Sequence, residues 1–288
     1  MKTIFKVVFF NLILSLAFFH SCKKSTLEIH NLNGDRITVI GHGGSGFYSA
    51  NNPYWENSYP SILRALYAYH ADGIEVDIQL SRDSVIILYH NDFLDESTNC
   101  SGCVQQHDAA DLYPCTYKYS TSLEDEKIID LNKITNLFKN SEVKPIIILD
   151  VKLSATCSDS TFSTQYQYIM ARRIMDAAKN FGEQYFYIES HDTVFLNIFQ
   201  QNNSQIHLIL DGRIEDGIIA IAADKKYYGI GVSNPNITKE DVDKAHQKNV
   251  RVVLFEVKNF FSTKNAVGKN PDMIQTDNVL LLQKMLNQ

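Results

Sequence analysis

The sequence lacks an excess of positive charge. It carries 27 Lys and Arg residues against 33 Asp and Glu residues, a formal net charge of −6. A polyanionic partner such as nucleic acid is therefore not expected. The chain also has no internal repeat and no low-complexity stretch. A hydrophobic content of 44% with a charged content of 21% indicates one globular domain and excludes a disordered or fibrous protein.

A hydrophobic run long enough to cross a bilayer is also lacking. At the N-terminus a short basic start is followed by apolar residues from Val7 to Phe19, interrupted by Asn11 and Ser15. Crossing a bilayer takes roughly 20 apolar residues, so this run is too short for a transmembrane anchor. A basic start and a short apolar run are typical of a secretory signal peptide, which we predict over residues 1–21.

Cys22 follows this segment directly. The stretch Ala17-Phe-Phe-His-Ser-Cys22 resembles a bacterial lipobox, in which the cysteine is lipidated and becomes the mature N-terminus. We expect lipidation at Cys22 and a tether over residues 22–36. The protein would then be exported to the bacterial cell envelope as a periplasmic or outer-membrane lipoprotein, held to the membrane by its lipid anchor. Cleavage to a soluble secreted form is the alternative.

Short apolar runs alternate with segments of helical period from Ile37 onward, which predicts a parallel α/β domain over residues 37–288. Nine runs are candidate strands, one more than an eight-stranded barrel needs. We expect Tyr228–Val232 or Met273–Thr276 to be the extra one. The other candidates are Ile37–Gly41, Gly73–Ile78, Val85–His90, Pro145–Val151, Gln184–Glu189, Ile206–Leu210 and Val250–Val257.

Helical periodicity predicts several of the connecting helices. The last of them has Thr238 placed to act as its N-cap, since a threonine hydroxyl can accept a hydrogen bond from an unpaired amide of the first turn. The expected helices are Ser58–His70, Leu131–Lys139, Thr161–Phe181, Thr193–Asn202 and Lys239–Lys248.

The segment 92–127 has neither period. It is long for a structureless connection, so we expect an insertion that covers the active site. It holds Cys100, Cys103 and Cys115, and Cys157 is the fourth cysteine after Cys22. An even number of cysteines in an oxidising compartment favours disulfides, and their irregular spacing argues against zinc. The pairing stays open, with a bond from Cys157 to one of the loop cysteines as a hypothesis.

Three acidic residues lie on two of the candidate strands. In Gly73-Ile-Glu-Val-Asp-Ile78 the alternation places Glu75 and Asp77 on one face. Leu149-Asp-Val-Lys152 adds Asp150 and Lys152 at the end of another strand. Carboxylates gathered on one face would repel each other without a cation, and three of them suit one Mg²⁺ or Ca²⁺ ion. No His or Cys lies beside them, which argues against zinc.

Two histidines end apolar runs. His42 closes Val39-Ile-Gly-His42, and His90 closes Ile86-Ile-Leu-Tyr-His90. Both are expected at the C-terminal ends of the strands, where parallel barrels place their chemistry. A near-neutral pKa lets one histidine take a proton while the other gives one.

A glycine-rich segment, Gly41-His-Gly-Gly-Ser-Gly46, follows the first candidate strand. The backbone amides of Gly43 and Gly44 can approach one another without hindrance from Cβ atoms. Such a segment is suited to binding a phosphate or another anion.

Together these motifs resemble those of the glycerophosphodiester phosphodiesterase family. That family has a His-Arg-Gly motif, then Glu-Asn-Thr, Gly-x-Glu-x-Asp, a His after the third strand, Glu-x-Lys and a closing Thr-Asp. The counterparts here, in the same order, are His42-Gly43-Gly44, Glu56-Asn57-Ser58, Gly73-Ile-Glu75-Val-Asp77, His90-Asn91-Asp92, Asp150-Val-Lys152 and Thr276-Asp277. Ser97-Thr-Asn-Cys-Ser-Gly102 resembles the Thr-Asn-rich segment that follows the second histidine of the family.

The resemblance implies a single (β/α)₈ TIM barrel of the phospholipase C-like phosphodiesterase type. It implies that Glu75, Asp77 and Asp150 bind one divalent metal ion, Mg²⁺ or Ca²⁺. His42 and His90 would be general acid and base, in an order that the sequence leaves open. Lys152 would contact the phosphate, and Glu56 and Asn57 would be secondary site residues.

The chain departs from the family pattern at three places. The phosphate-binding arginine after the first histidine is Gly43 here, which removes a charge-assisted contact usually worth about 1.5–3 kcal/mol. The glutamate of Glu-x-Lys is Asp150, as in the spider-venom sphingomyelinase D group. A Trp-Thr-Val-Asn segment near the C-terminus corresponds to Phe255-Glu-Val-Lys258, so the wall of the pocket should differ there.

The expected activity is metal-dependent hydrolysis of a small-molecule phosphodiester, a glycerophosphodiester that yields glycerol 3-phosphate and an alcohol. Two alternatives stay open. One is a lysophospholipase D- or sphingomyelinase D-like activity at the membrane surface. The other is a lipoprotein that binds a phosphorylated polyol without cleaving it, which the missing arginine would favour.

Overall fold

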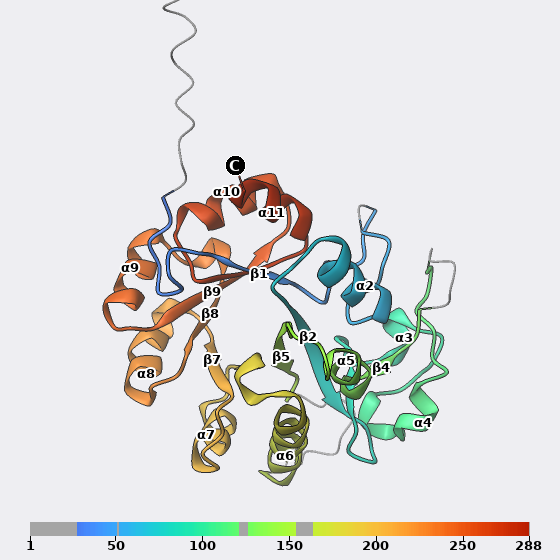
Figure 1. Cartoon of the computed structure of the whole chain (residues 1–288). Coiled ribbons are helices and arrows are strands. Elements are labelled where there is room, and N and C mark those ends of the chain that lie inside the picture. Colours follow the sequence, from blue (N-terminus) through green and yellow to red (C-terminus); the bar gives the residue numbers. More distant parts are fainter. Residues whose placement is uncertain (1–27, 51, 121–125, 154–163, 288) are drawn as a thin grey trace, which may run out of the picture.

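Eight parallel strands form a closed barrel. The structure is a computed structural model and describes residues 28–50, 52–120, 126–153 and 164–287. The first strand of the barrel pairs in parallel with both the second and the last, which closes the sheet. The helices lie around the strands, as expected for a (β/α)₈ barrel (Figure 1). The expected fold class is therefore confirmed.

The barrel strands, in chain order, are β1 Thr38–Gly41, β2 Gly73–Leu80, β5 Ile146–Val151, β6 Phe186–Ser190, β7 His207–Asp211, β8 Gly229–Ser233, β9 Arg251–Val257 and β10 Met273–Thr276. The helices around them are α2 Tyr59–Leu63, which continues as a π-helical turn over Arg64–Ala68, α5 Leu131–Phe138, α6 Thr164–Phe181, α7 Thr193–Gln201, α8 Ile218–Lys225, α9 Lys239–Gln247, α10 Phe260–Gly268 and α11 Val279–Leu286.

One of the nine predicted strands lies outside the barrel, but it is not one of the two that we expected. Both Tyr228–Val232 and Met273–Thr276 correspond to barrel strands, β8 and β10, so the expectation that one of them is superfluous is wrong. The extra strand is β3 (Ile86–Leu88), which pairs antiparallel with the end of β2. The reason is the short connection between β2 and β3, because a parallel crossover needs a dozen or more residues.

The predicted helices form close to their expected bounds. The Ser58 side chain accepts a hydrogen bond from the amide of Ser61 at the start of α2. Thr238 caps α9 as expected, and Asp241 completes a capping box with it. Helices α8, α10 and α11 were not among those expected from periodicity.

Two layers of apolar side chains stabilise the barrel. Ile148, Tyr187, Ile209 and Val253 belong to a cluster from alternate strand positions inside the barrel. The residues between them, such as Leu149, pack outward against the helices in a much larger cluster. This alternation means that polar residues in step with the inner cluster are directed into the mouth of the barrel.

The segment 92–127 is not structureless. It contains the short helices α3 (Leu94–Ser97) and α4 (Ala109–Leu112) and a 3₁₀ turn over Val104–Gln106, and it is followed by the short strand β4 (Ile129–Asp130). These elements lie outside the barrel ring (Figure 1), and their apolar side chains form a separate cluster with Ile87 and Tyr89. Elements of two to four residues carry little periodicity, which is why the sequence pattern missed them.

Disulfides stabilise this insertion. Cys100 is bonded to Cys115, and Cys103 is disulfide-bonded as well. The expectation of disulfides over a zinc site is therefore confirmed for these three cysteines. The hypothesis on Cys157 concerns a residue outside the described part of the chain.

The N-terminal predictions also fall outside it. The signal peptide over residues 1–21, lipidation at Cys22 and the first part of the tether lie before residue 28, where the description begins. Among the helices of the described residues, none combines the length and the apolar character needed to cross a membrane.

Candidate active site

A cavity of about 320 Å³ opens at the C-terminal ends of the barrel strands. Most of its lining comes from the last residues of the strands and from the loops that follow them, as is usual in this fold. The lining residues are His42, Phe47, Glu75, Asp77, His90, Asp150, Lys152, Glu189, Asp211, Phe255, Glu256, Lys258, Gln275 and Asp277. None of the described residues of the insertion 92–127 lines this cavity, so its role as a cover stays a prediction.

Three carboxylates form a compact group at the base of the cavity. Glu75 and Asp77 project from β2, and Asp150 projects from β5, where it lies opposite Asp77 in the parallel register. One oxygen from each carboxylate lies within 4.8 Å of the other two. Glu75 and Asp77 are almost completely buried. This arrangement of hard oxygen ligands fits a divalent cation such as Mg²⁺ or Ca²⁺.

Neighbouring groups fix the orientation of the two β2 carboxylates. The amide of Gly43 donates a hydrogen bond to Glu75 Oε2 at 2.9 Å. Asn57 Nδ2 donates to Asp77 Oδ2 at 2.8 Å, while Asn57 Oδ1 accepts from the Asp77 amide at 3.0 Å. Asn57 thus belongs to the site as a residue that positions Asp77, and its left-handed backbone, with φ of 62°, turns its side chain toward β2.

Lys152 lies among these acids. Its ammonium is 2.9 Å from Asp77 Oδ1 and 2.6 Å from Asp150 Oδ2. The sequence predicts that Lys152 contacts phosphate, and the structure places it at the cavity in an ion pair with two of the three carboxylates. Its contact with phosphate stays a prediction.

The proton affinities of the three acids differ. Burial and the nearby Asp77 raise the pKa of Glu75 from 4.5 to about 8. Burial would also raise the pKa of Asp77, but Lys152, His90 and the Asn57 hydrogen bond outweigh it, and the pKa lies below its usual value. Burial raises the pKa of Asp150 despite the attraction of Lys152. Such crowding of negative charge favours a cation.

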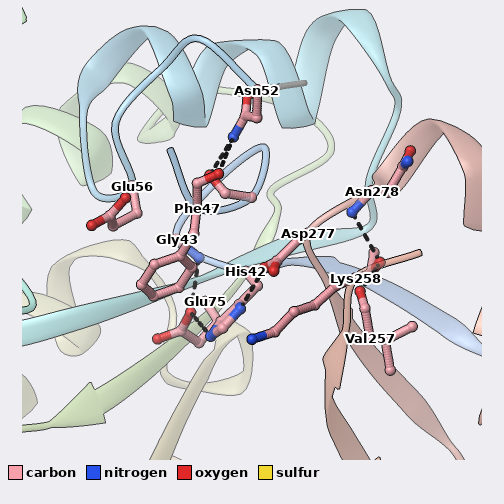
Figure 2. A network of polar contacts seen from close by, with 12 residues as sticks. His42, Gly43, Phe47, Asn52, Glu56, Glu75, Val257, Lys258, Asp277 and Asn278 are labelled. Atoms are coloured by element: carbon pink, nitrogen blue, oxygen red, sulfur yellow. Dashed lines mark hydrogen bonds and ion pairs between the residues drawn. The ribbon is translucent and has the colours of Figure 1, made fainter. Parts of the chain in front are cut away.

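His42 is oriented by a carboxylate from the last strand connection. Its Nδ1 lies 2.7 Å from Asp277 Oδ1, and its Nε2 is 3.8 Å from Glu75 Oε2 (Figure 2). Burial opposes the charge on this imidazole, but the Asp277 hydrogen bond and the charge of Glu75 outweigh it and raise the pKa of His42 from 6.5 to about 9. The surroundings of His42 therefore favour its protonated form.

His90 reaches the same cavity by a different route from the one expected. It follows β3, which returns antiparallel to β2, so it does not end a barrel strand. The Tyr89 amide donates to the Asp77 carbonyl, which places His90 beside the acids. His90 Nδ1 is 2.7 Å from Asn91 Oδ1. His90 lines the cavity as predicted, but the prediction that it ends a parallel barrel strand is wrong.

Phe47 lies between the two histidines. Its ring centre is 4.6 Å from that of His42 and 5.3 Å from that of His90. This nonpolar ring therefore contacts both imidazoles.

The glycine-rich segment was predicted to bind an anion through its backbone amides, but two of these amides are already hydrogen-bonded within the protein. The Gly43 amide donates to Glu75, and the Gly44 amide donates to the Gly41 carbonyl at 3.3 Å. Both amides that we expected to bind phosphate therefore have acceptors within the protein. Glu56 is buried and accepts a hydrogen bond from the Tyr48 amide at 3.1 Å, and it does not line the cavity.

Four polar residues of the cavity had no predicted role. Asp277 orients His42, whereas the family resemblance included Asp277 only as part of the closing Thr-Asp motif. Glu189 on β6 and Asp211 on β7 follow inward-facing residues by two positions, so strand alternation could have identified them. Burial and Asp150 raise the pKa of Asp211 from 3.8 to about 6. Gln275 donates a hydrogen bond to Glu189.

Comparison with known sequences agrees with this geometry. The sequence profile of the glycerophosphoryl diester phosphodiesterase family matches residues 42–281, which include every residue of the cavity. The chain belongs to this family. A glycerophosphodiester phosphodiesterase of Bacillus subtilis is 33% identical over 81 residues, 28% of this chain and 26% of the relative. One from Caldanaerobacter subterraneus is 30% identical over 122 residues, 40% of this chain and 48% of the relative. The alignments thus span less than half of these relatives.

Solved structures share the fold over most of the chain. A phosphodiesterase from Oleispira antarctica, solved in complex with the product sn-glycerol-3-phosphate, aligns with a TM-score of 0.71 at 17% identity and covers 87% of this chain and 97% of its own. A glycerophosphoryl diester phosphodiesterase from Parabacteroides distasonis aligns with a TM-score of 0.64 at 21% identity, covering 91% and 93%.

Proposed function

We propose that this protein hydrolyses phosphodiesters with the help of one divalent metal ion. The observation that carries the proposal is the convergence of three carboxylates and two histidines on one cavity. Glu75, Asp77 and Asp150 would hold the ion, and His42 and His90 lie on the same cavity. A protein that only bound a phosphorylated ligand would not need this combination.

The acids and the histidines would divide the chemistry between them. A bound divalent cation supplies a Lewis acid that polarises a phosphate oxygen and lowers the pKa of an attacking hydroxyl. The side chains of Asn57 and the amide of Gly43 keep the carboxylates in place for such an ion. Lys152 supplies positive charge beside the phosphate.

The hydrogen bonds of the two histidines support different roles for them in proton transfer. Asp277 Oδ1 lies 2.7 Å from His42 Nδ1 and stabilises the protonated imidazole, which supports His42 as the general acid that protonates the leaving alcohol. Asn91 Nδ2 lies 3.4 Å from Ser97 Oγ, which orients Oδ1 toward His90 Nδ1. The Nδ1–H of His90 then donates to Asn91, and Nε2 is left to take the proton of the attacking hydroxyl.

The substrate we propose is a glycerophosphodiester, cleaved to sn-glycerol 3-phosphate and an alcohol. The curated relatives carry this activity in their names, and the Oleispira antarctica phosphodiesterase was solved with sn-glycerol-3-phosphate as its product. The direct test is release of sn-glycerol 3-phosphate from glycerophosphocholine, glycerophosphoethanolamine and glycerophosphoglycerol with Mg²⁺ or Ca²⁺. We expect release with a metal and its loss with a chelator. No release from any of the three with either metal would refute the proposal.

A specific observation also favours a lipid substrate as a second candidate. Phe260 and Phe261 begin α10, two residues after Lys258 of the cavity lining, and their side chains are 52% and 81% exposed. Two exposed aromatic rings in the segment that follows the cavity suit contact with an acyl chain or a bilayer. The double variant Phe260→Ser/Phe261→Ser should lower turnover of a lysophospholipid several-fold while leaving glycerophosphocholine unaffected. Equal effects on both substrates would exclude this candidate.

We also propose that the protein is exported and lipidated at Cys22. The sequence before Cys22 supports it, as does the disulfide between Cys100 and Cys115, because disulfides persist in oxidising compartments. Mass spectrometry of the mature N-terminus after expression in a bacterium tests the proposal. We expect a diacylglycerol-modified Cys22, and an unmodified cysteine or an intact leader would contradict it.

A further inference from the structure

Strand β9 carries a bulge at the rim of the cavity. Ile274 of β10 pairs with Leu254, but Thr276, two residues later, pairs with Val257, three residues later. One extra residue is thus inserted in β9 between these pairs. Glu256 lies at the insertion in a left-handed conformation, with φ of 59°, which is unfavourable for a side chain other than glycine.

The bulge exchanges the two faces of the strand. Before it, Val252 and Leu254 pack outward against the helices and Val253 lies inside the barrel. Regular alternation would direct residue 257 inward and residue 258 outward. Val257 instead belongs to the outer cluster, so Lys258 takes the inward position.

Lys258 consequently lines the catalytic cavity. Figure 2 shows its side chain extending from the end of β9 toward His42 and Glu75. Lys258 also lines an adjoining hollow of about 330 Å³, so this residue lies between two spaces. Among the described residues, its ammonium forms no ion pair or hydrogen bond, whereas Lys152 is held by both Asp77 and Asp150.

Position 43 cannot easily supply a cation. The backbone of Gly43 has a φ of +57°, and a Cβ there would lie 2.5 Å from the Cβ of the buried Glu56. At the same time seven acidic residues line the cavity, and they repel an anionic substrate unless positive charge offsets them. A cation that takes the place of the missing arginine must therefore come from another residue of the cavity.

We propose that Lys258, turned inward by the bulge of β9, binds a non-bridging phosphate oxygen of the substrate and takes the place of the arginine missing at Gly43. This inference rests on the proposed function only in that the ligand is a phosphate ester. Lys258 is a binding residue that contributes positive charge and takes no part in proton transfer.

The test is calorimetric binding of two probes, sn-glycerol 3-phosphate and inorganic phosphate, to the full protein with Mg²⁺ or Ca²⁺. Lys258→Ala should weaken the binding of both probes by a similar factor, roughly tenfold or more, because the lost contact is to the phosphate group they share. Lys258→Arg should keep most of the affinity. Lys264→Ala, on the exposed face of α10 and away from the cavity, is the matched control and should bind as the wild type does.

Each outcome has a definite meaning. Affinity within twofold of wild type in Lys258→Ala, or an effect on sn-glycerol 3-phosphate without one on phosphate, overturns the proposal. A wild-type protein that binds neither probe also overturns the proposal. If Lys258→Ala loses binding but the wild type releases no product from any glycerophosphodiester, the role of Lys258 stands and the proposed hydrolysis fails. In a hydrolysing enzyme, KM should rise in Lys258→Ala by a larger factor than kcat falls.

Discussion

The two sides of the candidate active-site cavity are built differently. On the side of β2 and β5, regular alternation brings Asp77 and Asp150 into register, and their carboxylates have partners in Asn57 and Lys152. On the opposite side, β9 ends in a bulge with Glu256 in a strained conformation, and Lys258 extends into the cavity without a described ionic partner. The difference indicates that the first side is preorganised for chemistry, whereas the second can adapt to the ligand.

The largest effect should follow from a change on the rigid side. Asp150→Asn keeps the size of the side chain but removes one negative charge from the cluster that would hold the metal. Because metal chemistry supplies several kcal/mol of transition-state stabilisation, turnover should fall on the order of 10³-fold or more. Steady-state kinetics at saturating metal measures it. Asp243→Asn, on the exposed face of α9, is the control, and a loss below tenfold in Asp150→Asn would contradict the assignment.

The histidines should rank next. His42→Ala and His90→Ala should each lower turnover by at least 10²-fold, because each removes one proton-transfer group. Thermal unfolding of the same samples separates this loss from misfolding. Near-wild-type rates in both folded variants would show that proton transfer does not use this pair.

Asp277→Asn should lower the pKa of His42, the proposed general acid. The Asp277 hydrogen bond helps raise the pKa of His42 to about 9, so its weakening lowers that pKa. Since the general acid works when protonated, the alkaline limb of the pH–rate profile should move to lower pH. An unchanged limb, with reduced rate at every pH, would assign Asp277 a different role.

Metal-free stability should depend on pH in a definite direction. The pKa of Glu75 is raised from 4.5 to about 8, so the folded state retains a proton that the unfolded state has lost. Stability from this group is complete below pH 4.5 and declines as pH rises through 8. His42, raised from 6.5 to about 9, acts in the same direction. Melting temperatures with a chelator should therefore fall from pH 5 to 8.5, and stabilisation by Mg²⁺ or Ca²⁺ should grow over the same range. A flat profile in both conditions would contradict these shifts.

The smallest effect is expected at the bulge. Glu256→Gly relieves the left-handed strain, which costs about 1 kcal/mol or more, but adds the entropy cost of glycine, about 0.5–1 kcal/mol. The two nearly cancel, and loss of the exposed hydrogen bond from the Ser233 hydroxyl to Glu256 costs about 0.5–1.5 kcal/mol, so the free energy of unfolding should fall by no more than about 1.5 kcal/mol. Binding of sn-glycerol 3-phosphate should not weaken, because the bulge remains and one negative charge leaves the cavity lining. A loss of binding as large as in Lys258→Ala would show that Glu256 itself contacts the ligand.

Regular strands could be predicted from the sequence, whereas the bulge of β9 could not. Strand alternation placed Glu75, Asp77 and Asp150 on one face, and the same rule applied to Glu189 and Asp211 would have found two more cavity acids. The antiparallel β3 could have been inferred from its short connection to β2. The inward turn of Lys258 could not, because a bulge inserts a residue without a distinct sequence signal, and here its left-handed position is occupied by Glu256 in place of glycine.

The measurement that tests the central claim most directly is a ³¹P NMR time course of glycerophosphocholine with the wild-type protein. With Mg²⁺ or Ca²⁺, we predict that the diester resonance declines as the resonance of sn-glycerol 3-phosphate grows, and that a chelator stops both changes. A diester signal that stays constant with either metal would contradict the proposed hydrolysis. Growth of the product at the same rate with chelator would contradict the role of Glu75, Asp77 and Asp150 as metal ligands.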